Sequence, residues 1–496
     1  MNDLAGDPQL WKAAFYDRFV RPRASRIRGI RDQGTPAKSL FYSSRISKWL
    51  DDDHLVKRGK ATDWKRQYRL RHNWSRGSAS VSETQIAEPP STPPLLVRLC
   101  QDIVVIADAT TGLRAWSLKG EKRLIASTAL GTVGPASMAI DDTKCVDGGM
   151  NVAIGFSDGS FNIYTLSMTE RTFTHQYKHG PSTNGAILAV DYKSPYLLTM
   201  TGMPLLSLYR ISHDKDGMPD TASGAPYLLS SLRSHTAYPP LSLAIRTSST
   251  SIVASIAYAL PTWTSGWSVG LQEVRLTVEG LILDSRMATA STKSTRTPCT
   301  PFDVENKIPA MGDGPPCRPN RAGHLLIPSL TKPTSLSYNH PYLLSAHADN
   351  TLTLYMVTSK AQELSIVPGN RLWGHTASVS GAQVGDRGKA VSVSALGNEL
   401  RVWELEGGLS SGSTRRRAIT GAASVQVRPE NSCISAPKLQ KALRSFVRAP
   451  PHPFNQDQIL DASDFTKGWV AFDEERVVLL REKTQGAQAL VVYDFS

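Results

Sequence analysis

Two stretches of this chain have residue types and spacings that occur in catalytic sites. Residues 155–159 read GFSDG and match the G-x-S-x-G turn, in which a sharp strand-to-helix bend exposes a nucleophilic serine. A second strand, not a helix, is predicted after this turn, so Ser157 would lack the oxyanion hole that such a nucleophile needs. Residues 385–389 read GDRGK but have neither the spacing nor the Ser or Thr of a phosphate-binding loop. We therefore predict a protein that is not an enzyme by itself.

The cysteines and histidines do not form a metal-binding pattern either. The chain has no His-Glu-x-x-His motif and no Cys-x-x-Cys pair, and we expect no metal and no cofactor. The five cysteines are few and widely spaced, which is typical of reduced thiols in a cytoplasmic or nuclear protein: Cys100, Cys145, Cys299, Cys317 and Cys433. The first ten residues are polar, and no apolar run approaches about 18 residues, so neither a signal peptide nor a membrane span is predicted.

Charge is concentrated at the start of the chain. Residues 1–80 contain 18 Lys and Arg against 8 Asp and Glu, whereas the other 416 residues contain 38 against 35. The head therefore has a net charge of +10 and the remainder +3. Such an asymmetry indicates an acidic partner for the head, either nucleic acid or an acidic protein surface.

The head has the apolar spacing of short helices. Asp7 and Pro8 predict a helix start, after which Leu10, Trp11 and Phe15 lie on one face. A second amphipathic piece is predicted around residues 46–50 and a third over residues 62–74, where Trp64 and Tyr68 are four residues apart. The aromatic side chains among these basic residues would serve either as a core or as platforms for stacked bases.

The remainder of the chain is predicted to be built from a repeated unit of short strands. Its clearest copy runs from Leu372 to Leu405, and it opens on Gly-His at residues 374–375 and ends on Trp403-Glu404. This interval of about thirty residues resembles one blade of a WD-repeat β-propeller, which is a four-stranded antiparallel meander. Strand, turn and strand recur along the chain, which predicts seven blades within residues 78–496. Most copies have an aromatic residue near their end, namely Trp116, Tyr164, Tyr209, Tyr355 and Trp403.

Within the blades, certain residues are expected to hold the turns. In the WD pattern a His at the blade entrance and a Trp at its end tie the inter-blade loop to the strand beneath. We assign these blade-structural roles to His375, Trp403 and Trp116, and the turn-acid role to Asp158 and Asp349. In the clearest copy, Gly397 stands where the turn acid is expected.

Seven blades of about 45 residues leave a surplus of residues in this region. We expect the surplus in two insertions, at about residues 288–333 and 407–453, which are rich in Ser, Thr, Pro and Gly. The final blade offers three strands, at Ile459-Leu460, at residues 469–480 and at residues 489–495. An open ring would expose unpaired strand edges, so residues 78–87 are predicted to supply the fourth strand and close it.

The two ends of the chain resemble one family in particular. Residues 10–19, LWKAAFYDRF, look like the closing helix of an F-box; residues 64–77 are similar to the linker helix of fungal F-box and WD-repeat proteins, and GWVAFDEE at residues 468–475 extends the likeness. This implies an F-box remnant at residues 1–24, truncated at its N-terminus, a basic helical linker at residues 25–77 and the propeller at residues 78–496. The alternative interpretation of Trp11 and Phe15 is a helix that packs on the propeller and not on a partner.

The resemblance implies the substrate-recognition adaptor of a cullin-RING ubiquitin ligase of the SCF type. Leu10, Trp11 and Phe15 would then bind a Skp-type adaptor and, through it, the cullin scaffold, while the propeller would bind an unknown protein substrate. Better-known members read phosphate with arginines in the first strands of several blades, but the five such strands identified here contain no Arg. The alternative is a non-catalytic scaffold in a ribonucleoprotein or chromatin assembly, whose basic head binds nucleic acid.

Overall fold

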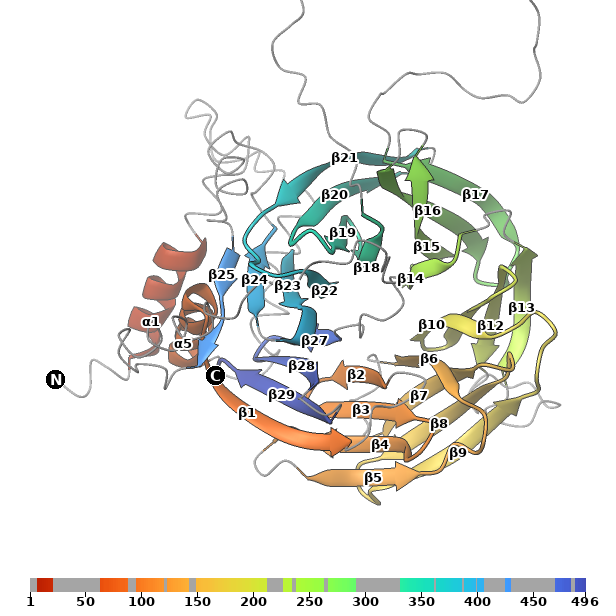
Figure 1. Ribbon diagram of the computed structural model, residues 1–496, viewed down its shortest axis with the longest axis horizontal. Coiled ribbons are helices and arrows are strands. Elements are labelled where there is room, and N and C mark those ends of the chain that lie inside the picture. Colours follow the sequence, from red (N-terminus) through yellow and green to blue (C-terminus); the bar gives the residue numbers. More distant parts are fainter. Residues whose placement is uncertain are drawn as a thin grey trace, which may run out of the picture.

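Strands dominate the computed structural model and form a ring of seven sheets around a central channel (Figure 1). The structure describes residues 7–20, 63–87, 95–119, 123–141, 149–211, 226–233, 238–262, 266–290, 331–360, 363–385, 388–397, 399–405, 424–429, 469–482 and 487–496. The prediction of a seven-bladed β-propeller with a short helical segment at its N-terminus is therefore confirmed.

The first four blades are antiparallel meanders whose strands follow one another from the channel to the rim. They comprise β2 (Leu96–Cys100), β3 (Ile103–Asp108), β4 (Gly112–Ser117) and β5 (Leu124–Thr128); β6 (Pro135–Ile140), β7 (Gly149–Phe156), β8 (Phe161–Ser167) and β9 (Thr172–His179); β10 (Ile187–Lys193), β11 (Tyr196–Thr201), β12 (Leu205–Ile211) and β13 (Pro226–Arg233); and β14 (Pro240–Thr247), β15 (Ser251–Thr262), β16 (Gly266–Thr277) and β17 (Ile282–Thr289).

The last three blades keep the same plan, and the seventh is closed by a strand from the other end of the region. They comprise β18 (Pro333–Asn339), β19 (Tyr342–His347), β20 (Leu352–Ser359) and β21 (Leu364–Leu372); β22 (Val379–Val384), β23 (Lys389–Ser394), β24 (Leu400–Glu404) and β25 (Ser424–Gln426); and β27 (Val470–Phe472), β28 (Arg476–Glu482), β29 (Gln488–Asp494) and β1 (Ser78–Ala87).

The core lies between the blades, because each sheet packs on its neighbours with both faces. The middle strands are therefore apolar on both sides and almost continuous in their burial: β11 is buried at all six positions and β3 at five of six. Outer strands alternate instead, as in β17, where exposed residues alternate with half-buried ones from Leu283 onward. This difference explains why only some strands show an alternating pattern in the sequence.

Ring closure follows the prediction made for residues 78–87. β1 pairs antiparallel with β29 from Ser80 opposite Asp494 to Ala87 opposite Gln488, and it lies at the outer side of the last sheet. The prediction for the strands inside this blade is partly wrong. Residues 469–480 do not form one strand but two, β27 and β28, because Asp473 accepts hydrogen bonds from the backbone of Glu475 and Arg476 and makes a tight turn.

The boundaries of the predicted insertions also need correction. The second one, at residues 407–453, contains β25 and a two-residue strand β26 (Arg428–Pro429), so part of it belongs to the ring. β26 pairs in parallel with the start of β1. Residues 291–330 of the first insertion, the strand predicted at Ile459-Leu460 and the helix predicted at residues 46–50 lie outside the described residues.

Among the described residues, two helices and one π-helical turn lie beside the ring (Figure 1). α1 (Pro8–Phe15) begins as predicted: Asp7 caps it by accepting a 2.8 Å hydrogen bond from the Gln9 N–H, and Pro8 follows at the first position. η2 (Tyr16–Val20) continues it. α5 (Trp64–Arg76) is capped by Asp63, which accepts from the Arg66 N–H at 3.0 Å. Within the described ranges no helix is long and apolar enough to cross a membrane.

Gly77 is the C-cap of α5, and β1 begins at the next residue. Gly77 has φ +69°, a left-handed conformation that suits glycine, and its carbonyl accepts a 2.7 Å hydrogen bond from the Arg428 N–H. A Cβ built on Gly77 would lie 2.3 Å from the Gln426 carbonyl oxygen. The helix and the closing strand are therefore joined at a point where no side chain fits.

We expect Gly77→Ala to destabilise the protein more than Gly131→Ala does. Both glycines have positive φ, at +69° and +91°, so both alanines are strained, but nothing lies within 4 Å of a Cβ at Gly131. The additional clash at Gly77 should lower the free energy of unfolding by about 1–3 kcal/mol beyond the loss in the control. Urea titration of the two variants measures this, and equal losses would mean that the junction yields without cost.

Candidate protein-binding site

The first strands of all seven blades line one central channel. It has a volume of about 780 Å³, and its wall takes residues from β2, β6, β10, β14, β18, β22 and β27. Small hydroxyl side chains and apolar ones alternate there, for example Ser242, Ser337 and Leu188, and the last is 41% exposed. Such a wall suits an uncharged segment of a polypeptide better than a nucleic acid.

Polar side chains link the inner strands of neighbouring blades around this channel. Ser137 donates to the Ile187 carbonyl at 2.7 Å, and Thr334 donates to the Val379 carbonyl at the same distance. Asp191 accepts from the Ile245 N–H at 2.6 Å. Each bond joins two blades that are held otherwise by apolar packing, so these bonds keep the channel wall in register.

One charged residue of the channel was missed by the sequence analysis. Arg98 lies on β2 and faces the channel, whereas the five inner strands compared in the sequence did not include this one. Its side chain is open to the water of the channel but enclosed by the ring, and this desolvation lowers the pKa of its guanidinium, against the opposing effect of Asp191. An arginine remains charged under such conditions. Had residues 96–100, LVRLC, been compared as the first strand of their blade, Arg98 would have been found in the sequence.

The blade-structural residues of the clearest repeat do meet in the structure. His375 Nε2 lies 2.6 Å from the Ser392 hydroxyl, and the Trp403 indole donates to the same hydroxyl at 2.7 Å. Burial lowers the pKa of His375 to about 4, so the ring is neutral near pH 7. A neutral imidazole can accept the Ser392 proton at Nε2, and the three side chains then tie the blade entrance to β23 and β24.

The acid of this blade is Glu399, which corrects the expectation based on Gly397. Glu399 accepts from both the Thr376 N–H and hydroxyl at 2.9 Å, and Arg401 Nε donates to it at 2.7 Å. It lies 3.5 Å from His375 Nδ1. A carboxylate two residues beyond the expected position, with one more methylene, therefore holds the turn, and the sequence pattern did not allow for that shift.

The other turn acids act locally. Asp158 accepts from the Ser160 N–H at 2.9 Å, and Asp349 accepts from the Thr351 N–H at 3.3 Å and pairs with Arg371 at 3.2 Å. Since β7 and β8 flank this Asp158 turn, the G-x-S-x-G match connects two strands and is not a nucleophile turn. Trp116 is half-buried, and its indole nitrogen has no hydrogen-bond partner within the described ranges.

A buried glutamate joins the fourth blade, which has no recognisable repeat signature, to the fifth blade. Glu273 on β16 is fully buried and lies within ion-pair distance of Arg246 and, at 3.3 Å, of Arg286. The hydroxyl groups of Ser359 and Tyr338 in the next blade donate to it at 2.6 and 3.3 Å. Because four groups satisfy this carboxylate, its burial is sustained. The only sequence signal was a glutamate inside an apolar strand.

The three residues assigned to adaptor binding have different surroundings. Phe15 is buried against Trp64, with ring centroids 5.6 Å apart, and Trp11 is half-buried against Tyr68 at 5.4 Å. Leu10 is 49% exposed and does not take part in this cluster. α1 therefore packs on α5 through aromatic rings, and of the three only Leu10 offers most of its side chain to a partner.

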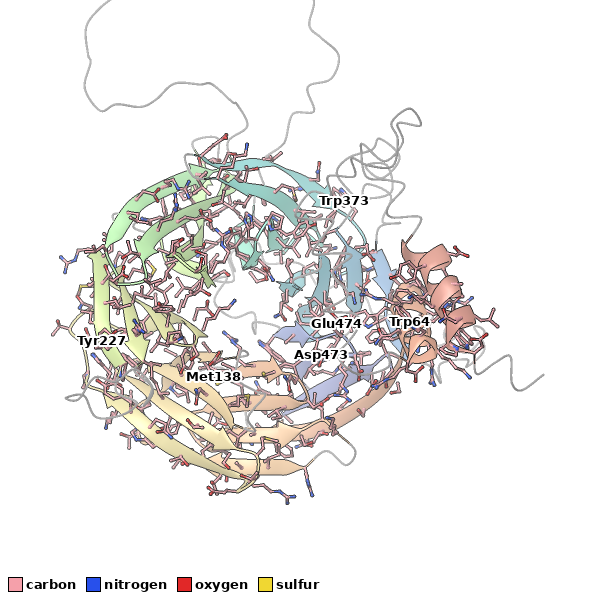
Figure 2. All side chains as sticks on the ribbon, turned by 180° about the vertical axis from the view of Figure 1, so that it is seen from behind. Trp64, Met138, Tyr227, Trp373, Asp473 and Glu474 are labelled. Carbon is pink, nitrogen blue, oxygen red and sulfur yellow. The ribbon has the colours of Figure 1, made fainter. Side chains whose placement is uncertain are left out.

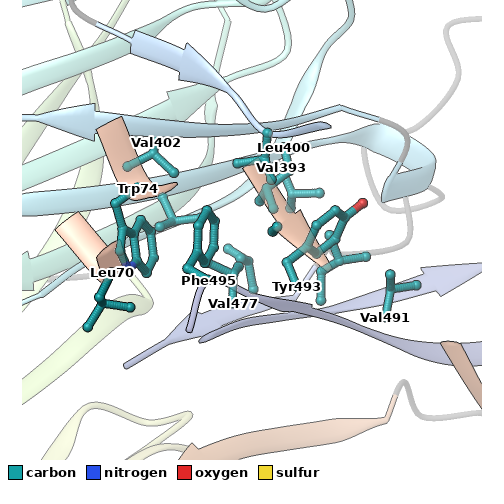
Figure 3. Close-up of a cluster of buried hydrophobic side chains, with 14 residues drawn as sticks. Leu70, Trp74, Val393, Leu400, Val402, Val477, Val491, Tyr493 and Phe495 are labelled. Atoms are coloured by element: carbon teal, nitrogen blue, oxygen red, sulfur yellow. The ribbon is translucent and has the colours of Figure 1, made fainter. Parts of the chain in front are cut away.

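α5 in turn is fixed to the ring between the sixth and seventh blades. Trp74 stacks on Phe495 with ring centroids 3.9 Å apart, and its indole donates to the Glu474 carbonyl at 2.9 Å. The Lys389 ammonium lies 3.9 Å from the Trp74 ring centroid. Figure 3 shows Trp74 and Leu70 in one cluster with valines of both blades. The two helices and the ring therefore form a single body.

A surface of exposed apolar side chains lies at the rim of the third and fourth blades. Gly280 lies against Leu229 of β13, which brings the end of β16 and the start of β17 next to β13. Figure 2 shows Tyr227 at this outer edge. Exposed apolar side chains flank this contact on both segments, namely Tyr227 and Leu228 on β13 and Leu281, Ile282 and Leu283 at the start of β17. Large exposed apolar groups at one place favour contact with another protein.

The buried histidines should make stability depend on pH. Burial lowers the pKa of His347 to about 4, while an unfolded chain titrates near 6.5. Between these values the unfolded state binds the proton and the folded state does not, so stability falls as pH falls. We expect His347→Asn to remove about 2 kcal/mol of the loss in unfolding free energy between about pH 7 and about pH 5.

The matched control is His175→Asn, since His175 is exposed on β9. Urea titrations of both variants at the two pH values give the comparison. If His347→Asn loses as much stability on acidification as the control, the imidazole is not held neutral by its surroundings.

Removing Trp74 should release the helices without opening the ring. Trp74→Ala leaves a cavity beside Phe495 and removes the bond to the Glu474 carbonyl, at a cost of about 3–5 kcal/mol. We expect faster amide hydrogen exchange throughout α5, with little change in β3 or β11. In the control Trp11→Ala, exchange should rise in α1 while α5 stays protected at its C-terminal end. Equal exchange in both variants would show that the stack does not hold α5.

The chain is similar to several proteins of known structure. Solved structures to which the chain is similar include the WD40 beta propeller domain of Doa1 (9% identity over 84% of this chain and 96% of that chain, TM-score 0.38) and the beta-propeller domain of Myceliophteria thermophila Cps50 (Swd1) (9% over 82% and 98%, TM-score 0.41). Saccharomyces cerevisiae Sqt1 is a third (9% over 84% and 98%, TM-score 0.40). A search of curated proteins finds no match.

A family model gives a match over most of the sequence. The model described as "F-box protein pof12 beta-propeller" matches residues 79–496, which begin within β1 and end with the last residue of the ring. The matched range therefore includes the closing strand and excludes the two helices. Because this match covers far more than half of the sequence, the chain belongs to the F-box protein pof12 beta-propeller family.

Proposed function

We propose that this protein is the substrate-recognition adaptor of a cullin-RING ubiquitin ligase of the SCF type. The propeller binds a target protein, and the helical segment before it binds a Skp-type adaptor, which brings in the cullin scaffold. The single observation that carries the proposal is the match of residues 79–496 to a propeller of F-box proteins. Family and fold also favour a binding protein that is not itself catalytic.

The geometry supports this proposal through the rigid path between the two ends of the molecule. α1 packs on α5 through Phe15 and Trp64, and α5 packs on the ring through Trp74 and Phe495. A partner held on α1 would therefore keep a fixed distance and orientation to a substrate held on the propeller. Transfer of ubiquitin to a bound substrate needs such a fixed arrangement, because loosely tethered groups seldom meet in reactive geometry.

The surfaces of the ring favour a protein as its ligand. The channel wall has one arginine, Arg98, among the residues described there, and it includes exposed Leu188. The apolar rim of the third and fourth blades offers further contact area. We therefore propose a substrate recognised mainly by shape, apolar contact and hydrogen bonds, and not by a row of arginines.

The test is co-purification with a purified Skp-type adaptor, with a surface substitution on α1. Leu10→Arg places a charge at the exposed leucine and should abolish binding, because a buried, unpaired charge is costly in an interface. Leu124→Arg is the control: Leu124 is similarly exposed, at 45% against 49%, but lies on β5 at the ring. The α1–α5 cluster does not include Leu10, so the fold should tolerate both changes.

Binding by the wild-type chain and by Leu124→Arg, together with loss in Leu10→Arg, would support the adaptor role. If the wild-type chain and the full product of its transcript both fail to bind, the ligase proposal is wrong. Equal binding by all three proteins would place the contact elsewhere than on the exposed face of α1.

A further inference from the structure

α5 has three faces, and two of them are already occupied. One face packs on the ring through Leu70 and Trp74, and another packs on α1 through Trp64 and Tyr68. The third face contains positions 65, 69, 72 and 76, which recur every three or four residues and therefore lie in one row along the helix. We call Lys65, Arg69, His72 and Arg76 the basic stripe.

The cations of α5 divide into two groups by their partners. On the ring side, Arg66 pairs with Glu475 at 2.6 Å and Arg71 approaches Glu474 at 3.9 Å. In the basic stripe, Lys65, Arg69 and Arg76 are exposed, and within the described part of the chain none has a carboxylate within ion-pair distance. Lys65 lies over the Trp11 ring, 5.8 Å from its centroid. The ring thus neutralises one face of α5 and leaves the stripe charged.

The stripe is reinforced by a neighbouring arginine. Arg18 on η2 donates to the Tyr68 hydroxyl at 2.7 Å and is itself exposed. Burial, and after it the guanidinium groups of Arg18 and Arg76, lower the pKa of His72. His72 Nδ1 is buried, and no described residue forms a hydrogen bond with it. Several positive charges are therefore gathered at one place, and the described residues supply no carboxylate that pairs with Lys65, Arg69 or Arg76.

We propose that the basic stripe is a docking surface for an acidic segment of a partner protein, bound in an extended conformation. The three exposed cations lie within residues 65–76 of α5, and the eleven steps from the first to the last correspond to about 16 Å along the helix axis. An extended chain rises about 3.3 Å per residue, so five or six of its residues cover this length. A short run of Asp or Glu therefore matches the stripe in charge and in length.

A nucleic acid fits this surface less well, because the aromatic rings nearby are not available to bases. Tyr68 stacks on His72 with an interplanar angle of 12°, and Trp11 and Phe19 pack against the same Tyr68. Trp64 and Trp74 are buried. Binding of a single strand usually combines phosphate contacts with stacking on exposed rings, and here only the charge is offered.

The experiment measures binding of the full chain to a fluorescein-labelled peptide of six glutamates by fluorescence anisotropy. A six-glutamine peptide and a DNA heptanucleotide with six phosphates are the comparison ligands. The stripe variant is Lys65→Gln/Arg69→Gln/Arg76→Gln, and the matched control is Arg123→Gln/Lys178→Gln/Arg233→Gln, which removes the same charge from exposed positions on the blades. A single Arg69→Glu variant accompanies them, and circular dichroism checks that each protein is folded.

We expect the glutamate peptide to bind, more weakly as salt rises, and the stripe variant to lose about tenfold or more while the control stays within about twofold. Arg69→Glu should lose at least as much as any single neutral change, so the result stands even if the triple variant folds poorly. Equal loss in stripe and control variants, or no binding by the wild-type chain, would overturn the proposal.

Stripe-dependent binding of the heptanucleotide that is tighter than that of the peptide would also overturn it and would assign the surface to nucleic acid. The inference does not rest on the ligase role. Adaptor binding is tested at Leu10, which lies outside the stripe and is unchanged in these variants.

Discussion

Closure of the ring by β1 is the constraint on which the rest of the structure depends. A propeller without closure would expose the outer edge of β29 and leave its backbone groups unpaired. β1 covers that edge over residues 80–87 and continues to β26 through its first two residues. Because the closing strand comes from the N-terminal side of the ring, everything directly before it is held at the junction of the sixth and seventh blades. The position of α5 is therefore a consequence of how the ring is closed.

The blades solve one problem, the anchoring of inter-blade turns, with different side chains. The sixth blade uses His375, Ser392 and Trp403 with Glu399 as the acid, while the fifth uses His347 with Ser345 and Thr353. The fourth has neither, and relies on buried Glu273 satisfied from two blades. In each of these blades neighbouring side chains donate to or pair with the buried polar group, so the strand pattern is kept although the residues of the motif change.

This variation sets the limit of what the sequence could predict. Strand periodicity, the aromatic residue near the blade end and the need for closure predicted seven blades and the role of residues 78–87, because these depend on local pattern and on counting. Glu399 was missed because a longer side chain reached back to a position that the pattern had assigned to residue 397. Arg98 was missed because its strand was not compared with the other inner strands. β25 and β26 were missed because three-residue and two-residue strands have no periodicity.

In the helical head, the sequence predicted the helices but not which of their side chains are buried. Spacing predicted α1 and the pairing of Trp64 with Tyr68 on one face, yet it could not say that Phe15 is buried under Trp64 while Leu10 stays exposed. Burial there depends on a contact between segments 49 residues apart in the chain. Once that contact forms, the aromatic rings become a core, and the cations that had surrounded them in the sequence divide into a ring-facing set and an open one. On α5, the positive charge of Lys65, Arg69 and Arg76 therefore lies along a single face, and among the described residues no carboxylate pairs with it.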